Sequence, residues 1–415
     1  MASQVFDQVA ADALLKQIYS VEAMEDLSYS DRPFYALCPK TGGVGGNGAK
    51  LPILISTSQG YAPTVAAAQS VLAAQDILAF LVTPKVLLSV ARISGLTLES
   101  SMTSKQAFSK GSAVVINSAI KRLSNAVSSA LFRDGSGTVA TITPTSFAVA
   151  GICQLADPAD SVQFEVNGAI QFATAAGLLT GIVYVTSVNR ITGVLTTSAS
   201  LGGANASPSS WNNTYLNVLY ANTQNMLPFG LQAWLTDDVT ALGTAFNGVV
   251  RNTDSTRLGG VVYDGTAMSV KDAVVSSANL VAREGGRPDF FICSYESYTQ
   301  LALDLGSNVI YTNLSSGGPG STGKISFSGF KFMSPKGEIT VVADRDCPPQ
   351  KGFLLQMDTW QILHANEGSP VFLDENQGVI LRTIESYDGR EVRVKAYLNL
   401  ACVAPGYNAK VLLSA

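Results

Sequence analysis

A single amphipathic segment of roughly thirty residues, from Ser104 to Arg133, constrains the fold of this chain most. At about 100° per residue, one face collects its apolar side chains, which are Phe108, Val115, Ile116, Ala119, Ile120, Leu123, Ala126, Val127, Ala130 and Leu131. The opposite face collects polar residues, which are Lys110, Asn117, Lys121, Ser124, Asn125, Ser128 and Ser129. Gly135 is placed to end the helix in the left-handed conformation. The pattern predicts a helix about 40 Å long that lies across a sheet or another subunit.

Composition indicates that other chains cover part of the surface. Of the 415 residues, 47% are apolar and only 14% are charged, whereas a charged fraction of about 25% is usual. Uncovered apolar surface promotes aggregation, so a surface this poor in charge is best explained by contacts with further subunits. The net charge is −4 and no run of Lys or Arg exceeds two residues. The sequence therefore shows no linear basic patch of the kind that grips nucleic acid.

The cysteines and the N-terminal residues indicate in which cellular compartment the chain is made. The five cysteines stand far apart, which argues against a disulfide framework and a CxxC zinc site and predicts buried, reduced thiols. The first twenty residues lack the basic start and apolar block of a signal peptide. The most apolar segment, from Ile77 to Val90, is interrupted by Pro84 and Lys85 and is too short to span a bilayer. We expect a chain that is made in a cytoplasm and stays soluble.

The first half of the chain divides by composition and pattern. Residues 1–39 are expected to form an extended arm with a short helix, and Pro33 and Pro39 to stiffen an open segment. Two extended legs, 51–57 and 77–97, flank the small-residue loop 58–74 and predict a projecting hairpin. After the long helix, residues 136–222 are nearly uncharged and β-like. They predict a small insertion with its own core, with a hairpin over 181–188 and 192–197 and a loop at 202–213.

The second half predicts a mixed α+β layer followed by strands. We expect a helix that Thr236 caps and that carries Val239, Leu242, Phe246 and Val249. Further helices are predicted over 270–283 and, capped by Ser294, over 295–305, with a strand between them at 290–293 and a loop at 312–323. The remaining predicted strands cover 325–333, 339–342, 353–357, 360–364, 379–386 and 390–402. The last two form a hairpin about Asp388-Gly389.

Three motifs resemble those of enzymes but lack their context. Gly43-x-Gly45-x-x-Gly48 matches a dinucleotide-binding pattern, yet an extended segment follows where a helix is required. The near P-loop from Gly318 to Lys324 continues with Ile325, where Ser or Thr should bind Mg²⁺. Ser118-x-x-Lys121 and Lys40-Thr41-Gly42 occur in the reverse of the order found in penicillin-recognising enzymes, without an intervening Ser-Asp-Asn. We therefore expect no cofactor-binding residue.

No residue set stands out as a catalytic or metal centre. His364 is the only histidine and shares a strand face with Trp360 and Ile362, which favours a packed core residue over a catalyst. Asp237-Asp238 fit a helix start. Asp344 and Asp346 flank Arg345 in a turn, and a carboxylate-pair hydrolase or a Ca²⁺ site stays open for such residues, although no spacing favours either. We name no catalytic, cofactor or metal residue and expect a protein that is not an enzyme.

The order of the segments resembles that of major capsid proteins of tailed bacteriophages with the HK97-type fold. The likeness also lies in residues 286–294, GRPDFFICS, with the helix after them, and in the ending from Arg393 to Pro405. In the family's terms the α+β chain would divide into an N-arm (1–39), an E-loop hairpin (40–100), a spine helix of the P-domain (101–135), an all-β insertion domain (136–222), an A-domain (223–365), and P-domain strands with a trailing C-terminus (366–415).

The resemblance implies a structural subunit of a virion. Such proteins assemble with themselves as hexamers and pentamers into an icosahedral shell around double-stranded DNA, with a portal protein and in some cases separate scaffold or decoration proteins as partners. They are made in the host bacterial cytoplasm, need no cofactor and contact no membrane. Two alternatives stay open: a cellular nanocompartment shell of encapsulin type, and a β-rich virion or surface protein in which 136–222 binds a ligand. Lys50 and Lys85 lie in the hairpin region, but no signature predicts a cross-link.

Overall fold

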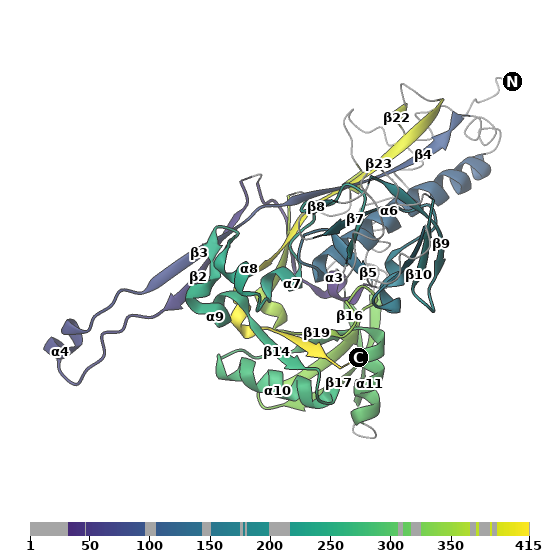
Figure 1. Ribbon diagram of the computed structural model, residues 1–415. Helices are drawn as coiled ribbons and strands as arrows, with labels where there is room; N and C mark the ends of the chain where they lie inside the picture. Colours follow the sequence, from purple (N-terminus) through teal and green to yellow (C-terminus); the bar gives the residue numbers. More distant parts are fainter. Residues whose placement is uncertain are drawn as a thin grey trace.

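The computed structural model describes residues 32–45, 47–95, 105–142, 151–174, 177–178, 181–198, 216–305, 310–316, 325–365, 371–372, 382–383 and 388–414. Two large sheets build the body, a further sheet forms a ring of strands beside it, and a two-stranded hairpin extends far from it (Figure 1). Within the described residues, no helix is long and apolar enough to cross a membrane. The short elements that connect the sheets are α7 (Leu231–Trp234), α8 (Val239–Gly243), η4 (Arg251–Asp254), α9 (Ser255–Gly259), η6 (Met357–Thr359) and η7 (Pro405–Tyr407).

The long helix α6 spans Lys105–Phe132, which confirms the predicted helix within one residue at each end. Gly135 follows with φ +87°, the left-handed conformation expected after the helix. The prediction that only one face of the helix is buried is wrong for its second half. Ser124, Ser128 and Ser129 are all buried, because other elements cover their face; the ring of Phe34 in α3 (Pro33–Leu37), for example, lies 5.2 Å from that of Phe132.

A central sheet lies against α6. Its strands are β1 (Lys40–Thr41), β4 (Lys85–Ser94), β20 (Trp360–His364), β21 (Val371–Phe372), β22 (Arg382–Thr383) and β23 (Gly389–Cys402). The antiparallel pair β4–β23 runs from Ser94↔Gly389 to Lys85↔Leu398 and supports the helix along its length (Figure 1). The predicted strands 360–364 and 390–402 are confirmed. Of the predicted strand 379–386, only Arg382–Thr383 lies within the described residues and forms a strand.

The projecting hairpin consists of β2 (Ala49–Ser56) and β3 (Asp76–Val82), with the short helix α4 (Val65–Ser70) at its far end (Figure 1). The predicted second leg, 77–97, is wrong as one strand. It divides at Thr83-Pro84 into β3 and β4, and β4 pairs with β23 in the body instead of with β2. Proline has no N–H to continue a ladder, and the chain leaves the hairpin there.

Residues 138–220 form a separate ring of strands. Its strands are β5 (Thr138–Ile142), β6 (Ile152–Gln154), β7 (Ala169–Thr174), β8 (Gly177–Leu178), β9 (Val183–Asn189), β10 (Val194–Thr197) and β11 (Leu216–Tyr220). The order β5-β11-β7-β9-β10-β6 closes on itself, since Ile142 bridges Leu155 directly after β6. The ring has its own core, and its β9–β10 pair confirms the predicted hairpin. The predicted loop 202–213 lies outside the described residues.

The third sheet has the order β14-β24-β19-β15-β18-β17-β16. Its strands are β14 (Val261–Gly265), β15 (Phe290–Cys293), β16 (Ile310–Ser316), β17 (Ile325–Ser334), β18 (Gly337–Ala343), β19 (Lys351–Leu355) and β24 (Ala409–Leu413). The helices α10 (Val270–Arg283) and α11 (Tyr295–Leu305) contribute to its core and confirm the predicted spans. Side chains of Ser269 and Ser294 accept backbone N–H groups at the starts of these helices.

Four local predictions are wrong. Residues 33–37 are a buried helical turn, not an open segment, because Phe34 and Tyr35 enter the core. The predicted helix with Phe246 and Val249 is instead the short α8, capped by Asp238, followed by the hairpin β12 (Ala245–Phe246) and β13 (Val249–Val250). Residues 312–316 of the predicted loop belong to β16. The C-terminus does not trail away, since β24 pairs with both β14 and β19.

Candidate assembly surfaces

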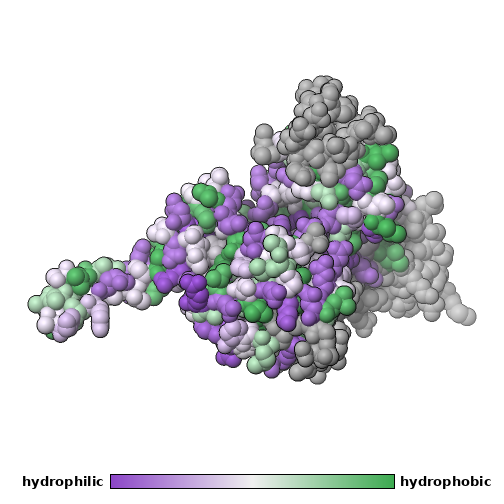
Figure 2. Space-filling model, turned by 60° about the horizontal axis from the view of Figure 1, so that its bottom comes forward, coloured by the Kyte–Doolittle hydropathy of each residue, from purple (hydrophilic) through white to green (hydrophobic). Residues whose placement is uncertain are grey.

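The far end of the hairpin is apolar, uncharged and exposed. No Asp, Glu, Lys or Arg occurs between Lys50 and Asp76. Tyr61 is 93% exposed, Val65 74% and Leu72 64%, and α4 has no buried residue. Hydrophobic residues gather at this end in the space-filling view (Figure 2). An isolated two-stranded hairpin is marginal in water, so the tip, residues 57–75, needs a partner surface to become well packed.

The base of the hairpin is firmly held by the body. Phe80 is fully buried, and its ring lies 5.1 Å from that of Trp234 and 6.2 Å from that of Phe246. The N–H of Leu81 donates to the carbonyl of Asn247 at 2.8 Å, and the guanidinium of Arg257 donates to the carbonyl of Ile55. The hairpin therefore leaves the body in a fixed direction while its tip extends beyond the core.

A second apolar surface lies on the central sheet. Val86, Leu88 and Val90 alternate along β4, and each is more than half exposed. Their cross-strand partners on β23 are Tyr397, Lys395 and Arg393. We call this surface the β4 face. Because alternate residues of β4 are apolar on both sides of the strand, its sequence pattern is that of a strand covered on both faces.

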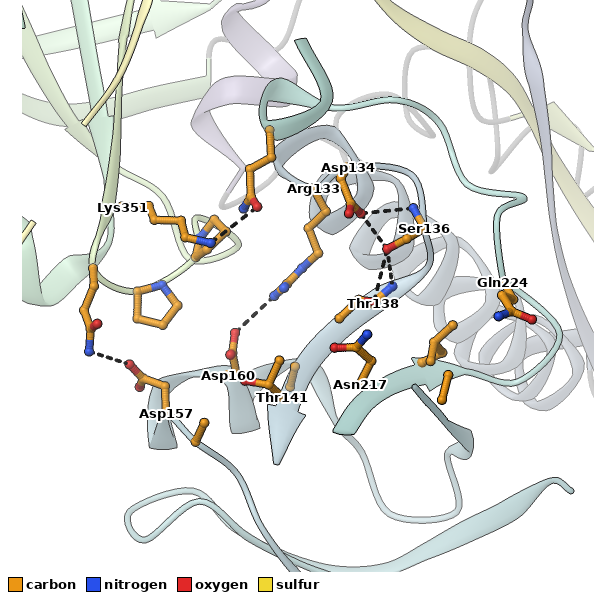
Figure 3. Close-up of a pocket in the computed structure, with 18 of the residues that line it drawn as sticks. Arg133, Asp134, Ser136, Thr138, Thr141, Asp157, Asp160, Asn217, Gln224 and Lys351 are labelled. Carbon is orange, nitrogen blue, oxygen red and sulfur yellow. Dashed lines mark hydrogen bonds and ion pairs between the residues drawn. The ribbon is translucent and has the colours of Figure 1, made fainter. Parts of the chain in front are cut away.

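A polar cleft of about 520 Å³ separates the ring from the body (Figure 3). Arg133 at the end of α6 donates to Asp160 of the ring at 3.0 Å, and Gln350 of the third sheet's β18–β19 loop donates to Asp157 at 3.5 Å. Lys351 donates to Gln232 at 3.4 Å. The Arg133–Asp160 and Gln350–Asp157 contacts cross the cleft and connect the ring with the body.

Burial changes the pKa of two cleft groups. Burial raises the pKa of Asp160, and the neighbouring Arg133 guanidinium opposes that rise. Burial also lowers the pKa of Lys351, with the cations Lys410 and Arg133 acting in the same direction. Both shifts follow from desolvation and neighbouring charges. No pair of groups here forms a nucleophile with its base, and within the described ranges no three His, Cys, Asp or Glu side chains are grouped to hold a metal ion.

The Asp344–Asp346 turn is a buried joint. Asp344 is fully buried, and its carboxylate accepts the N–H groups of Phe34 at 3.1 Å and of Asp346 at 2.9 Å. Asp346 is also buried and accepts the side-chain amide of Gln163 at 2.9 Å. Burial and the nearby Asp346 raise the pKa of Asp344 to about 7. The turn thereby joins the N-terminal segment and the ring to the third sheet, and neither carboxylate is presented to a substrate.

The other residues that the sequence singled out are structural. His364 is 3% exposed, and burial together with Lys40 lowers its pKa to about 4. All five cysteines are buried free thiols, as predicted; burial raises the pKa of Cys38 to about 12. Asp237 pairs with Lys410 at 3.4 Å, and Asp238 caps α8. These positions agree with packing and capping roles.

The enzyme-like motifs within the described residues lack the structural context that they require. The glycines of the segment 43–48 lead into β2, so the dinucleotide pattern lacks its helix. Ser118 donates to the carbonyl of Val115 at 2.7 Å on the surface of α6, and Lys121 beside it is exposed. The near P-loop at 318–324 lies outside the described residues. The two motifs that the structure describes therefore do not assemble a site.

Sequence reasoning missed the contacts that bind the ring to the body. Asp157, Asp160 and Gln163 belong to the short helix η2 (Pro158–Gln163) and its cap, and their partners lie between 27 and 193 positions away. An Asp-Pro start is a recognisable local cap signal, but it does not identify distant partners. The β4 face did have a signal, since residues 86–91 are apolar at nearly every position.

Comparisons with known proteins identify solved structures that resemble this fold. No protein-family model and no curated protein sequence matches the chain. Among solved structures, a chain of the cyanophage A-1(L) capsid superposes with a TM-score of 0.53 at 12% identity, over 92% of both chains. The encapsulin SrpI of Synechococcus elongatus PCC 7942 superposes with a TM-score of 0.42 at 9% identity, over 97% of this chain and 94% of that one. Mycobacterium phage Bobi gives 0.43 at 9%, over 99% of both.

The cyanophage similarity extends over nearly the whole of both chains, so it describes the full architecture and not one shared motif. The chain has the fold of a phage capsid protein, which confirms the expectation of an HK97-type fold of class α+β.

Proposed function

We propose that this chain is the major capsid subunit of a tailed bacteriophage. It assembles with itself as hexamers and pentamers into an icosahedral shell that encloses double-stranded DNA. The observation that carries the proposal is the uncharged, exposed hairpin tip on a body that holds only its base. The similarity of the fold to a phage capsid chain supports the same conclusion. A portal protein, and separate scaffold or decoration proteins, are the further partners of this role.

The proposal assigns a role to each part of the chain. Residues 1–39 are the N-arm, 40–100 the E-loop region, 101–135 the spine helix and 136–222 the insertion domain. Residues 223–365 are the A-domain and 366–415 the P-domain strands with the C-terminus. In the structure β24 adds to the sheet of β14, β15 and β19, which supports counting 409–413 with the A-domain sheet.

The hairpin tip supplies the first half of a contact between copies. Each large aliphatic side chain that becomes fully buried stabilises an interface by roughly 1.5–3 kcal/mol. Val65, Val71 and Leu72 are all more than half exposed in the single chain. Each contact can be weak, because a closed shell repeats it in every subunit.

The β4 face supplies the second half. Its three exposed aliphatic residues form a stripe that an apolar hairpin can cover. Packing face against face is favoured over edge pairing at β2, because Pro52 lies in the middle of that strand and removes a backbone donor. In this arrangement the tip of one copy lies over the β4 face of the next.

Removal of the tip tests the proposal. Residues 57–75 are replaced by an Asn-Gly turn between Ser56 and Asp76, so that the anchor Phe80 remains. We expect a folded subunit that stays small in analytical ultracentrifugation, whereas the unaltered chain forms closed shells by electron microscopy. Closed shells of normal size from the shortened chain would contradict the role of the hairpin.

A pair of point variants sharpens the same test. Val65→Asp with Leu72→Asp places two charges in the apolar contact, while Gln69→Asp places one on the same exposed helix. We expect the first variant to abolish shells and the second to retain most of them.

The nucleic-acid content of purified shells separates a capsid from a nanocompartment. Double-stranded DNA inside the shells supports the capsid role, and an enzyme cargo without DNA contradicts it.

A further inference from the structure

Two strongly exposed aliphatic side chains lie at opposite ends of the third sheet. Among the described residues from 216 onward, Val239 and Leu303 are the most exposed large hydrophobic residues, at 83% and 77%. Val239 begins α8, beside the edge strand β14, whereas Leu303 lies on α11, which packs on β18 (Figure 1). β18 is the fourth strand from β14, so the two regions lie roughly 19 Å apart across the sheet. Neither side chain can cover the other in the same copy.

An apolar hollow of about 530 Å³ lies beside β14. Its apolar lining consists of Val239 and Leu242 of α8, Val261 and Val262 of β14, and Leu280 of α10. Leu242 and Val261 are buried, whereas Val239 is left in solvent. An exposed apolar surface with polar residues around it is typical of a site where another protein binds.

The outer face of α11 carries a narrow stripe that could fill such a hollow. Tyr295, Thr299 and Leu303 follow one another at intervals of four residues, and all three are exposed. They therefore share one face of the helix and span about 12 Å along its axis. Ser297 and Leu301 lie on the opposite face and are buried.

The charges at the two ends of the third sheet are complementary. α11 carries the exposed carboxylates Glu296 and Asp304 and no basic residue. The rim of the hollow carries Arg283, exposed at the end of α10. Asp237 on the same rim is already paired with a lysine of β24 at 3.4 Å, and Glu284 borders both this hollow and the one at the base of the hairpin. Arg283 thus suits an acidic partner, although Glu284 beside it makes the expected gain modest.

We propose that the outer face of α11 in one copy docks into the hollow beside β14 in the next copy. Leu303 packs against Val239 and Leu242, and Asp304 pairs with Arg283. The contact uses a different patch on each partner, so it is heterologous and repeats head to tail until a ring closes. The proposal rests on the capsid role proposed above, because it supplies the contact within one hexamer or pentamer.

Linking of introduced thiols tests the contact in the full chain. The double variant Val239→Cys with Leu303→Cys is treated during assembly with a short bifunctional maleimide. The five natural cysteines are buried, so they should not react. We expect a ladder of linked copies on a denaturing gel that ends at the hexamer, with positions 239 and 303 joined in the peptides identified by mass spectrometry.

Single variants distinguish a head-to-tail contact from a symmetric one. Leu303→Cys alone should give no linked species, and a mixture of the two single variants should give dimers only. Val239→Cys with Tyr184→Cys is the matched control, since Tyr184 is exposed on the ring, and it should give no ladder. Linked dimers from Leu303→Cys alone would overturn the head-to-tail contact in favour of a symmetric one.

Charge exchange tests the pairing of Arg283 with Asp304. In the double-thiol chain, Arg283→Glu should lower the yield of the ladder about twofold to fivefold, the range expected for an exposed ion pair. Adding Asp304→Arg to that chain should restore the yield, because opposite charges then meet again. Lys271→Glu, which changes an exposed charge elsewhere on α10, should leave the yield unchanged. A loss that Asp304→Arg does not restore would overturn this pairing.

The same measurements separate this contact from the capsid role. Closed shells without links between positions 239 and 303 would overturn the contact and leave the hollow to a different protein, while the capsid role would stand. A chain that stays monomeric under every condition of assembly would overturn both.

Discussion

The hairpin tip and the ring of strands both lie outside the main body, yet they differ in what holds them. The ring closes its strands upon one another and buries a core that includes Phe172 and Leu195. The tip, residues 57–75, buries nothing of its own in α4 and exposes Tyr61, Val65 and Leu72. One region completes its structure within the chain, and the other exposes apolar side chains that, in the proposed shell, a second copy covers. The ring is therefore a domain with its own core, whereas the tip is a surface suited to a contact with another molecule.

The largest effect should come from removing the anchor of the hairpin. Phe80→Ala leaves a cavity between Trp234 and Phe246, and truncating a buried phenylalanine costs about 3–5 kcal/mol. Denaturant unfolding of the subunit measures the loss. Leu54→Ala, on the same hairpin but 49% exposed, is the control and should change little. Equal effects of the two substitutions would show that the base is not anchored as described.

A loss of similar size, confined to one region, is expected in the ring. Phe172→Ala removes a fully buried side chain from the ring core and should cost about 3–5 kcal/mol there. Hydrogen exchange should show faster exchange of the amides in β7 and β11, while the amides of β15 keep their protection. Tyr184→Ala, exposed on β9, serves as the control. Loss of protection throughout the chain would contradict a ring with its own core.

The Asp344–Asp346 turn, which joins the ring to the third sheet, should respond to pH. The pKa of Asp344 is raised from 3.8 to about 7 in the folded chain, so between these values the folded state holds a proton that the unfolded state has released. The free energy of unfolding therefore decreases as pH rises from about 4 to 7. Asp344→Asn should flatten this part of the profile, and an unchanged slope would exclude Asp344 as its source.

The smallest effect on stability is expected at the tip. Leu72→Ala should change the free energy of unfolding of the single subunit by less than about 0.5 kcal/mol, because the side chain is already exposed. The same substitution should reduce the yield of shells in light scattering. A clear loss of subunit stability without a loss of assembly would reverse the contrast between the tip and the ring.

Elements with complete local signals were predictable from sequence. The helices α6 and α10 have long apolar periodicity, and the strand β15 is a short apolar run after Pro288. Where two local signals compete, the apolar spacing can predict the wrong element. Phe246 and Val249 fit a helical spacing, but Asn247-Gly248 between them is a tight-turn pair, and both residues adopt positive φ, +49° and +87°.

Features that depend on distant partners were not predictable. The strand β24 is short and becomes a strand by pairing with β14 and β19, roughly 150 and 60 residues earlier. Ser124 and Ser128 are polar residues that tertiary packing buries on a second face of α6. The same holds for two further contacts, the bridge between Ile142 and Leu155 that closes the ring and the hydrogen bond from Gln163 to Asp346. In neither case does the local sequence of one segment predict its partner.

Electron cryomicroscopy of the particles formed by the unaltered chain tests the central claim most directly. The account predicts closed shells in which residues 57–75 of one subunit lie against Val86, Leu88 and Val90 of another, with Val65 and Leu72 buried in that contact. Shells in which the tip remains in solvent, or a chain that stays a single compact subunit at high concentration, would contradict it.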